Sequence, residues 1–327
     1  MASIRDVARL ANVGPATVSR VINNNGYVSE DARERVNQAI DTLNYTPNEL
    51  ARNLFRSRAG LIGILVPDIS HPFFSTFVSC AERELYQRGY KVMLCNTSEE
   101  GNAEQEYLSM LERHIVDGII TDVHTLNVEE YKRIQKPIVA LDRYLGKNIP
   151  VVSSDHREGG RLAALTLIRN GCRKVLHFKA AERFEAPFLE RHTEFNRVMA
   201  EYRIQVVPFE IEWNEFRQDY FRDAIAGLFE KGFDYDGVFG GDLPAVECMN
   251  QCLRHRIRVP DDVKIVAYDG TFVTEIASPH VTSVVQPVEQ LAKTSVEIMM
   301  QELNGIPSTE KHIRIPVTLR KGDTTIM

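Results

Sequence analysis

The sequence predicts an α/β protein that carries a small, entirely helical head at its N-terminus. Between Ile4 and Ser57 apolar residues recur at helical spacing, whereas from Leu61 onward short apolar runs alternate with helical stretches. The alternation runs through two successive series of strands and helices, which is typical of doubly wound parallel sheets. We therefore expect a helical head, a short connector and a larger part that consists of two lobes.

The head is expected to begin with three helices in series: Ile4 to Leu10, Pro15 to Asn23 and Glu30 to Leu43. A tight turn at residues 11–14 joins the first two, and Pro15 suits the first turn of a helix, where its missing N–H costs nothing. Small apolar residues stand where the two helices would cross: Val7, Ala8, Val13, Val18 and Val21. This arrangement is a helix-turn-helix, whose second helix enters the major groove of DNA.

A fourth helical segment, Asn48 to Arg56, follows Pro47 and places Leu50 and Leu54 on one face. Its nine residues are too few for a stable helix in water. We therefore expect this segment to fold only when it is docked on DNA and on a second copy of itself. The short stretch 57–60 then gives a flexible joint.

Two motifs in this region carry a family resemblance. One is Ile4-Arg5-Asp6-Val7-Ala8 followed by Ala16-Thr17-Val18-Ser19-Arg20-Val21-Ile22-Asn23, and the other is Tyr45-Thr46-Pro47-Asn48-Glu49-Leu50-Ala51-Arg52-Asn53-Leu54. At this separation they resemble the DNA-binding signature and the hinge helix of the LacI-type (LacI/GalR family) bacterial transcriptional repressors. The similarity continues through the chain and is greatest to sucrose-operon repressors. It implies a homodimer with a periplasmic-binding-protein-like sensor, whose partners are operator DNA and a small-molecule sugar effector.

The resemblance places Pro15, Ala16 and Arg20 at base-reading positions. The planar guanidinium of Arg20 can donate two hydrogen bonds to guanine O6 and N7. Such a contact favours guanine over another base by roughly 1–3 kcal/mol. Three further side chains suit phosphate contacts: Thr17, Ser19 and Asn23. Leu54 stands where the family's leucine enters the minor groove and wedges open a base step. The structural alternatives are a solvated surface Arg20 and a Leu54 that packs inside a linker.

The larger part is expected to contain two series of buried parallel strands. The first is Leu61 to Val66, Tyr90 to Leu94, Gly118 to Thr121, Pro137 to Leu141 and Val151 to Ser153; the second is Lys174 to Phe178, Ile204 to Val207, Gly237 to Phe239, Val263 to Tyr268 and Val281 to Val284. We expect a head at 1–47, a hinge helix and linker at 48–60, and an effector-binding and dimerisation domain at 61–327. Its first lobe would span about 61–158 plus 288–318, and its second about 159–287 plus 319–327.

Ligands bind beyond the carboxyl ends of such strands, so polar and aromatic residues there are candidates for effector contacts. Four such residues follow predicted strands: Phe73, Phe74, Asp242 and Asp269. The family resemblance adds Arg191 and Trp213 to these candidates. Carboxylates can accept hydrogen bonds from sugar hydroxyls, and aromatic faces can pack on a sugar ring. The family resemblance maps Phe73, Phe74, Arg191 and Asp269 onto its effector pocket and places Trp213 near its ring-stacking aromatic residue.

Each candidate has a structural alternative. Phe73 and Phe74 begin an amphipathic helix and can both belong to the core. Asp242 and Asp269 can cap the segments that follow them, and Arg191 can be a solvated helix residue. Asp155, which precedes Gly159-Gly160, can line the cleft or cap the helix behind it. The stretch Arg191-His192-Thr193-Glu194-Phe195 departs from the family's Arg-x-x-Gly-Phe pattern, which indicates a rebuilt ligand loop around residues 184–195.

The net charge of −6 is unevenly distributed along the chain. Residues 1–60 hold eight arginines against six acidic residues, a balance of +2, so the remainder carries −8. Attraction for phosphate is therefore concentrated in the head. Because the excess there is small, we expect useful DNA affinity only when two copies act together.

Several function classes are disfavoured by what the sequence lacks. The stretch from Met1 to Val21 has no signal-peptide core and no apolar run reaches membrane-spanning length, so a cytoplasmic protein is expected. The five cysteines are odd in number and scattered, which predicts reduced thiols. The chain contains no Gly-x-Ser-x-Gly elbow, no Gly-x-Gly-x-x-Gly fingerprint, no phosphate loop and no metal-ligand spacing. We expect no enzyme activity, no cofactor and no metal.

These observations together predict a repressor of a sugar-utilisation operon, released from a palindromic operator by sucrose, fructose or a related saccharide. Arg191 is the one clear candidate cation near the cleft, which favours a neutral sugar over a sugar phosphate. One alternative is a global or corepressor-type regulator of the same family. A remote alternative is a nucleotide- or sugar-linked α/β enzyme, because two α/β lobes alone do not exclude one.

Overall fold

The computed structural model describes residues 2–45, 58–97, 103–123, 126, 128–181, 185–212 and 215–326. Internal contacts divide the chain into two units, Met1–Ala59 and Gly60–Met327, and each is considered by itself. The hinge helix expected at Asn48 to Arg56 lies outside the described residues, as do Leu54 and Trp213.

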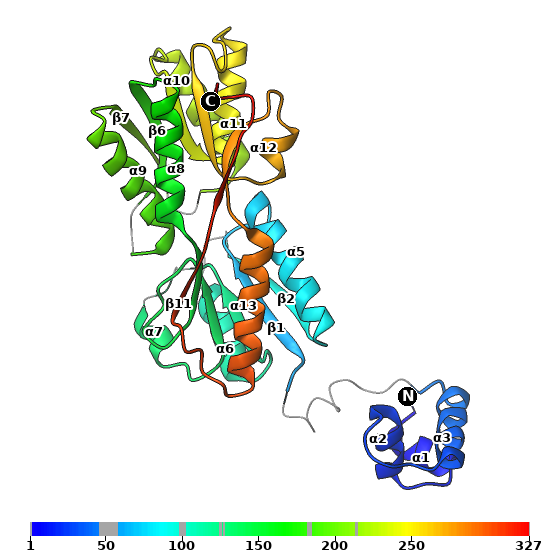
Figure 1. Cartoon of the computed structure of the whole chain (residues 1–327). Helices are drawn as coiled ribbons and strands as arrows, with labels where there is room; N and C mark the ends of the chain where they lie inside the picture. Colours follow the sequence, from blue (N-terminus) through cyan, green and yellow to red (C-terminus); the bar gives the residue numbers. More distant parts are fainter. Residues whose placement is uncertain are drawn as a thin grey trace. The chain divides into compact units, whose positions relative to one another are not determined.

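The first unit contains the three predicted helices, α1 (Ile4–Leu10), α2 (Pro15–Asn23) and α3 (Glu30–Thr42) (Figure 1). A capping box starts α1: the Ser3 hydroxyl accepts from the Asp6 backbone N–H, and the Asp6 carboxylate accepts from the Ser3 N–H. Asn12 adopts φ 51°, which turns the chain sharply between α1 and α2. A small core holds the helices together: Val7, Ala8, Ala11, Val18, Val21, Val36 and Ala39.

The second unit contains two six-stranded sheets (Figure 1). The first has the strand order β11-β5-β4-β3-β1-β2, and every pairing in it is parallel. Its strands are β1 (Leu61–Val66), β2 (Lys91–Asn96), β3 (Gly118–Thr121), β4 (Ile138–Leu141), β5 (Val151–Ser154) and β11 (His312–Ile315); its helices are α5 (Pro72–Gln87), α6 (Ala103–Glu112), α7 (Val128–Lys132) and α13 (Val288–Leu303).

The second sheet has the order β12-β10-β9-β8-β6-β7, with only β12 antiparallel to its neighbour. Its strands are β6 (Lys174–Ala180), β7 (Gln205–Ile211), β8 (Gly237–Gly241), β9 (Lys264–Asp269), β10 (Thr282–Val285) and β12 (Thr318–Arg320). Its helical segments are α8 (His156–Arg169), a short 3-10 turn at Pro187–Leu189, α9 (Glu190–Glu201), α10 (Gln218–Glu230), α11 (Asp242–Arg254) and α12 (Phe272–Ile276).

Buried apolar clusters lie on both faces of each sheet. In the first lobe α5 and α13 cover one face, and α6 and α7 cover the other. In the second lobe α10 and α11 cover one face, and α8 and α9 cover the other. Burial on both faces is the reason why the strands read as continuous apolar runs in the sequence. The predicted fold class is confirmed.

The chain crosses between the two sheets three times: after β5, after β10, and between β11 and β12. The sequence reading did not include β11, β12, α9 or α10. The two strands are short, contain polar residues and are only partly buried, so they form no clear apolar run. The two helices carry many charged residues, which interrupt the apolar pattern of a helix. Within the described residues no helix is long and apolar enough to cross a membrane.

Candidate functional site

A cavity of about 150 Å³ lies between the two lobes, where the carboxyl ends of both sets of strands meet. Side chains from both lobes line it and fall into three chemical kinds. The aromatic rings are Phe73, Phe74, Phe178, Phe188, Phe216 and Phe221; the guanidinium groups are Arg143 and Arg191; the carboxyl groups are Asp122, Asp142, Asp269, Glu212 and Glu215. His71, His192 and Gln286 add further polar groups to the lining.

The aromatic wall joins the lobes. Phe74, at the start of α5, lies with its ring centroid 5.4 Å from His71, 5.4 Å from Phe73 and 5.6 Å from Phe216, which comes from the other lobe. Phe73 and Phe74 belong to the buried core and also line the cavity, so a place in the core does not exclude them as candidates for effector contact. Burial lowers the pKa of His71, which keeps its ring neutral and able to pack in this wall.

Asp269 lies at the end of β9, with φ 106°. Its Oδ1 accepts a hydrogen bond of 2.8 Å from the Gln286 amide, whose Oε1 accepts a bond of 2.8 Å from the Ser154 hydroxyl. Arg191 Nη1 lies 3.7 Å from the same Oδ1. The carboxylate is therefore held from the end of β5 and from the crossover after β10. Sequence reasoning missed Gln286, although its position just after a predicted strand was a usable signal.

Arg191 lies in the first turn of α9 and is not a solvated residue, because its side chain is only 17% exposed. The guanidinium carbon lies 4.5 Å from the Tyr268 ring centroid and 5.6 Å from that of Phe188. A cation over an aromatic face is stabilised by the ring quadrupole, more so where water is excluded. The rings and Asp269 thus fix Arg191 at the cavity wall.

Arg143 is a second buried cation that the sequence reading did not single out. It follows β4; its Nε lies 3.2 Å from Asp122 Oδ1, and its guanidinium carbon lies 4.9 Å from the Phe188 centroid. Burial raises the pKa of Asp122 to about 8, against the opposing effect of Arg143, and burial lowers the pKa of Arg143 to about 10. Arg143 and Arg191 thus face Phe188 from different lobes.

A buried histidine connects the lobes beside these arginines. His156, the first residue of α8, lies with Nε2 2.7 Å from Asp142 Oδ1 and with Nδ1 2.8 Å from the Tyr268 hydroxyl. Asp142 comes from the first lobe and has φ 52°, whereas Tyr268 lies in β9 of the second lobe. Any change in the angle between the lobes must rearrange this hydrogen-bonded chain.

The head presents the predicted reading residues on one helix. Pro15, Ala16 and Arg20 of α2 are exposed, and Thr17, Ser19 and Asn23 are half-buried. The Asn23 amide donates a 2.8 Å hydrogen bond to the Ser19 carbonyl of its own helix. The exposed arginine is available for a base edge, while the half-buried residues lie beside the core that anchors the helix.

Known families match both parts of the chain. Residues 3–48 match the model "Bacterial regulatory proteins, lacI family", and residues 164–325 match the periplasmic binding protein-like domain. The chain is 37% identical over 325 residues to the sucrose operon repressor of Streptococcus mutans, covering 99% of each protein. The chain belongs to the lacI family. The resemblance expected from its motifs is confirmed.

Other relatives of this lacI-family chain are similarly close. It is 37% identical to the ribose operon repressor of Halalkalibacterium halodurans, covering 99% of this chain and 97% of that protein. A periplasmic binding protein/LacI transcriptional regulator from Alkaliphilus metalliredigens QYMF, solved in complex with D-xylulofuranose, is 31% identical. That structure has a TM-score of 0.73 and covers 82% of this chain and 100% of its own. The relatives are transcriptional repressors, so the prediction that the chain is not an enzyme is confirmed.

Two of the carboxylates singled out in the lacI-family chain are caps and do not line the cavity. Asp242 is 1% exposed and accepts hydrogen bonds from the Gly270 N–H, the Thr271 N–H and the Thr271 hydroxyl. Asp155 accepts from the Glu158 N–H at 3.0 Å and starts α8. Asp242, predicted to contact the effector, is thus not among the residues that line the cavity, and the loop after β9 uses both of its oxygens.

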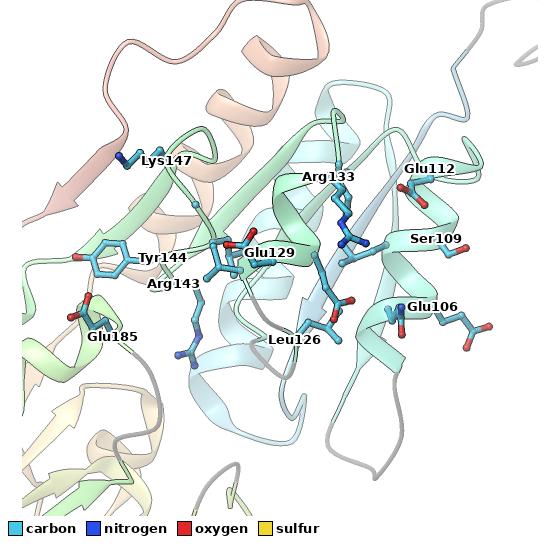
Figure 2. A pocket seen from close by; sticks show the side chains of 17 residues that line it. Glu106, Ser109, Glu112, Leu126, Glu129, Arg133, Arg143, Tyr144, Lys147 and Glu185 are labelled. Atoms are coloured by element: carbon cyan, nitrogen blue, oxygen red, sulfur yellow. The ribbon is translucent and has the colours of Figure 1, made fainter.

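A second hollow of this lacI-family protein is larger than the cleft cavity. It encloses about 1530 Å³ against α6, α7 and residues 143–147 of the first lobe, with Glu185 at its edge (Figure 2). In Figure 2 the Arg143 side chain points away from Glu112 and Arg133, which line this hollow. The hollow draws almost entirely on one lobe and lacks the facing aromatic rings of the cleft. The cleft is therefore the stronger candidate for a ligand site despite its smaller volume, because polar and aromatic side chains from both lobes converge on it.

Gly160 determines how closely α9 can approach α8. A Cβ atom at this position would lie 2.2 Å from the carbonyl O of Arg191, well inside contact distance. Gly160→Ala is expected to push the start of α9 outward and to lower the free energy of unfolding by about 1–3 kcal/mol, the usual cost of overpacking. Urea unfolding followed by circular dichroism measures this change.

Gly227→Ala is the matched control for Gly160→Ala. Gly227 also lies inside a helix, but a Cβ atom there meets nothing within 4 Å. The control is expected to raise the free energy of unfolding by roughly 0.5–1 kcal/mol, because alanine is the better helix former. Equal effects of the two substitutions would contradict the role assigned to Gly160.

Proposed function

We propose that the protein is a cytoplasmic, homodimeric repressor that binds a near-palindromic operator and leaves it when a neutral monosaccharide occupies the cleft. The observation that carries this proposal is the cavity itself: guanidinium groups, carboxylates and aromatic rings from both lobes converge on one small space. Such groups match the hydroxyls and the apolar face of a sugar ring. The relatives named as sucrose and ribose operon repressors support a sugar in general.

The size of the cavity favours a monosaccharide over sucrose. Its volume of about 150 Å³ lies below the roughly 300–1,000 Å³ of pockets that hold drug-sized ligands. A single furanose or pyranose ring suits this space better than a disaccharide does. The relative solved with D-xylulofuranose supports the same class of ligand.

The charges around the cavity favour a neutral ligand. Two guanidinium groups face the cavity, together with the carboxylates of Asp142, Asp269, Glu212 and Glu215. Asp122 also lines it, but because burial raises its pKa to about 8 it adds no full negative charge near neutral pH. A phosphate would need an excess of positive charge to offset its loss of hydration, and this lining does not provide one.

The proposed switch couples the lobes to the head. A sugar that contacts Phe74 and Arg143 of one lobe and Arg191 and Asp269 of the other favours one angle between the lobes. That angle would set the spacing of the two copies and decide whether their segments at 48–56 can pair as helices on DNA. To move the protein from mostly bound to mostly free, the sugar must prefer the released form by a few kcal/mol.

Thermal-shift measurements on the full-length protein test this proposal. D-Ribose, D-xylulose, D-fructose, sucrose and the corresponding monosaccharide phosphates are compared over a range of concentrations. A free monosaccharide at about 100 times its Kd should raise Tm by roughly 5–10 °C, because binding to the folded state alone adds about 2.7 kcal/mol. A shift with sucrose alone would overturn the size argument, and a shift with phosphates alone would overturn the charge argument.

A further inference from the structure

We propose that His192, His177 and Asn196 form a directed hydrogen-bond chain that orients Arg191 for effector binding, so that both histidines are positioning residues. This inference rests on the proposed role of Arg191 in the cleft. The chain runs from the cleft into the second lobe, between α9, which carries Arg191, His192 and Asn196, and β6, which carries His177.

The four side chains are joined end to end. Arg191 Nε lies 3.4 Å from His192 Nε2, His192 Nδ1 lies 2.9 Å from His177 Nε2, and His177 Nδ1 lies 3.1 Å from Asn196 Oδ1. His192 and His177 are both fully buried, and the ring centroids of Phe195 and Phe239 lie 4.7 and 5.2 Å from that of His177. The two imidazoles therefore have these partners in place of water.

The guanidinium sets the direction of every bond, because arginine can only donate. His192 must accept at Nε2, so its proton is on Nδ1 and is donated to His177 Nε2. His177 then carries its own proton on Nδ1 and donates it to Asn196 Oδ1. Both rings are thereby neutral Nδ1–H tautomers. Burial lowers the pKa of His192 and lowers that of His177 to about 3, which agrees with two uncharged rings.

This hydrogen-bond chain determines the orientation of the Arg191 guanidinium. With Nε directed inward to His192, the terminal nitrogens are left toward the cleft, where Nη1 lies 3.7 Å from Asp269 Oδ1. A guanidinium held in a single orientation loses less side-chain entropy when it binds a ligand. His192 also lines the cavity, and its proposed role there is to fix the orientation of Arg191.

The tautomers can be measured without any sugar. Two-bond ¹H–¹⁵N spectra of the full-length protein labelled with ¹⁵N-histidine report which ring nitrogen carries the proton. We expect His177 and His192 both to be neutral Nδ1–H forms between about pH 6 and 8, a range in which an exposed histidine titrates. An Nε2–H form, or a protonated ring, at either residue would overturn the chain even if no sugar bound.

Substitution tests the effect on binding. His192→Leu removes both the acceptor and the donor, whereas His192→Gln keeps one of each; His280→Asn, at a histidine whose side chain is 66% exposed, is the control. With D-ribose in isothermal titration calorimetry, His192→Leu should weaken Kd on the order of tenfold, as for one lost charge-assisted hydrogen bond. His192→Gln should restore most of that loss, and the control should match the unchanged protein.

The outcomes separate this inference from the proposed function. If His192→Leu binds D-ribose as tightly as the unchanged protein, or if His192→Gln is no better than His192→Leu, the positioning role is wrong. If the unchanged protein binds none of the tested sugars, the proposed effector fails while the tautomer measurement still decides the chain. Should His192→Leu not fold, the ¹⁵N spectra and His192→Gln carry the test.

Discussion

Asp269→Ala is expected to leave a folded protein that still binds operator DNA but no longer responds to a monosaccharide. Asp269 is the point at which Gln286 and Arg191 converge on the cavity. Its removal deprives the sugar of an acceptor and leaves a buried amide and a guanidinium without their partner. Hydrogen bonds to a charged group contribute about 1.5–3 kcal/mol each, so the sugar's Kd should rise on the order of a hundredfold.

Calorimetry with the monosaccharide and fluorescence anisotropy with operator DNA measure the two properties separately. Asp242→Asn provides the contrast. Asp242 directly follows β8, as Asp269 ends β9, but its carboxylate accepts hydrogen bonds from the backbone N–H groups of Gly270 and Thr271. That variant should lose stability and retain sugar affinity. A normal sugar response in Asp269→Ala would place the effector elsewhere.

Arg20→Ala is expected to lose operator preference while sugar binding stays unchanged. Arg20 is exposed on α2, the second helix of the helix-turn-helix. The loss of one bidentate contact with guanine costs about 1–3 kcal/mol, which corresponds to roughly 5- to 150-fold weaker operator binding in each half-site. Affinity for random duplex should fall far less, because the expected phosphate contacts of Thr17, Ser19 and Asn23 remain.

Arg9→Ala is the matched control for Arg20→Ala, since it removes the same charge from α1, where the Arg9 side chain is 81% exposed. It should weaken operator and random duplex by similar factors. Competition binding at one fixed salt concentration distinguishes the two variants. Operator preference that survives Arg20→Ala would remove this residue from the reading role.

The helical head and the buried strands were predictable because their signals are local. Val18 and Val21 recur at helical spacing, and a strand buried on both faces, such as β1 (Leu61–Val66), is an uninterrupted apolar run. By contrast α9 (Glu190–Glu201) carries many charged residues on its exposed side, so its apolar face is interrupted along the sequence. Which residues of α9 are buried becomes evident only in the folded structure, where the helix packs against α8.

The sequence alone determined the family, the two-lobed α/β architecture, and the candidacy of Phe74, Arg191 and Asp269. Only the tertiary structure distinguished Asp269 from Asp242, although each stands at the end of a parallel strand. The reason is that the use of a carboxylate depends on which donors reach it, and these donors come from distant parts of the chain. Arg143 and Gln286 join the cavity for the same reason, since three crossings bring separate segments to one cleft.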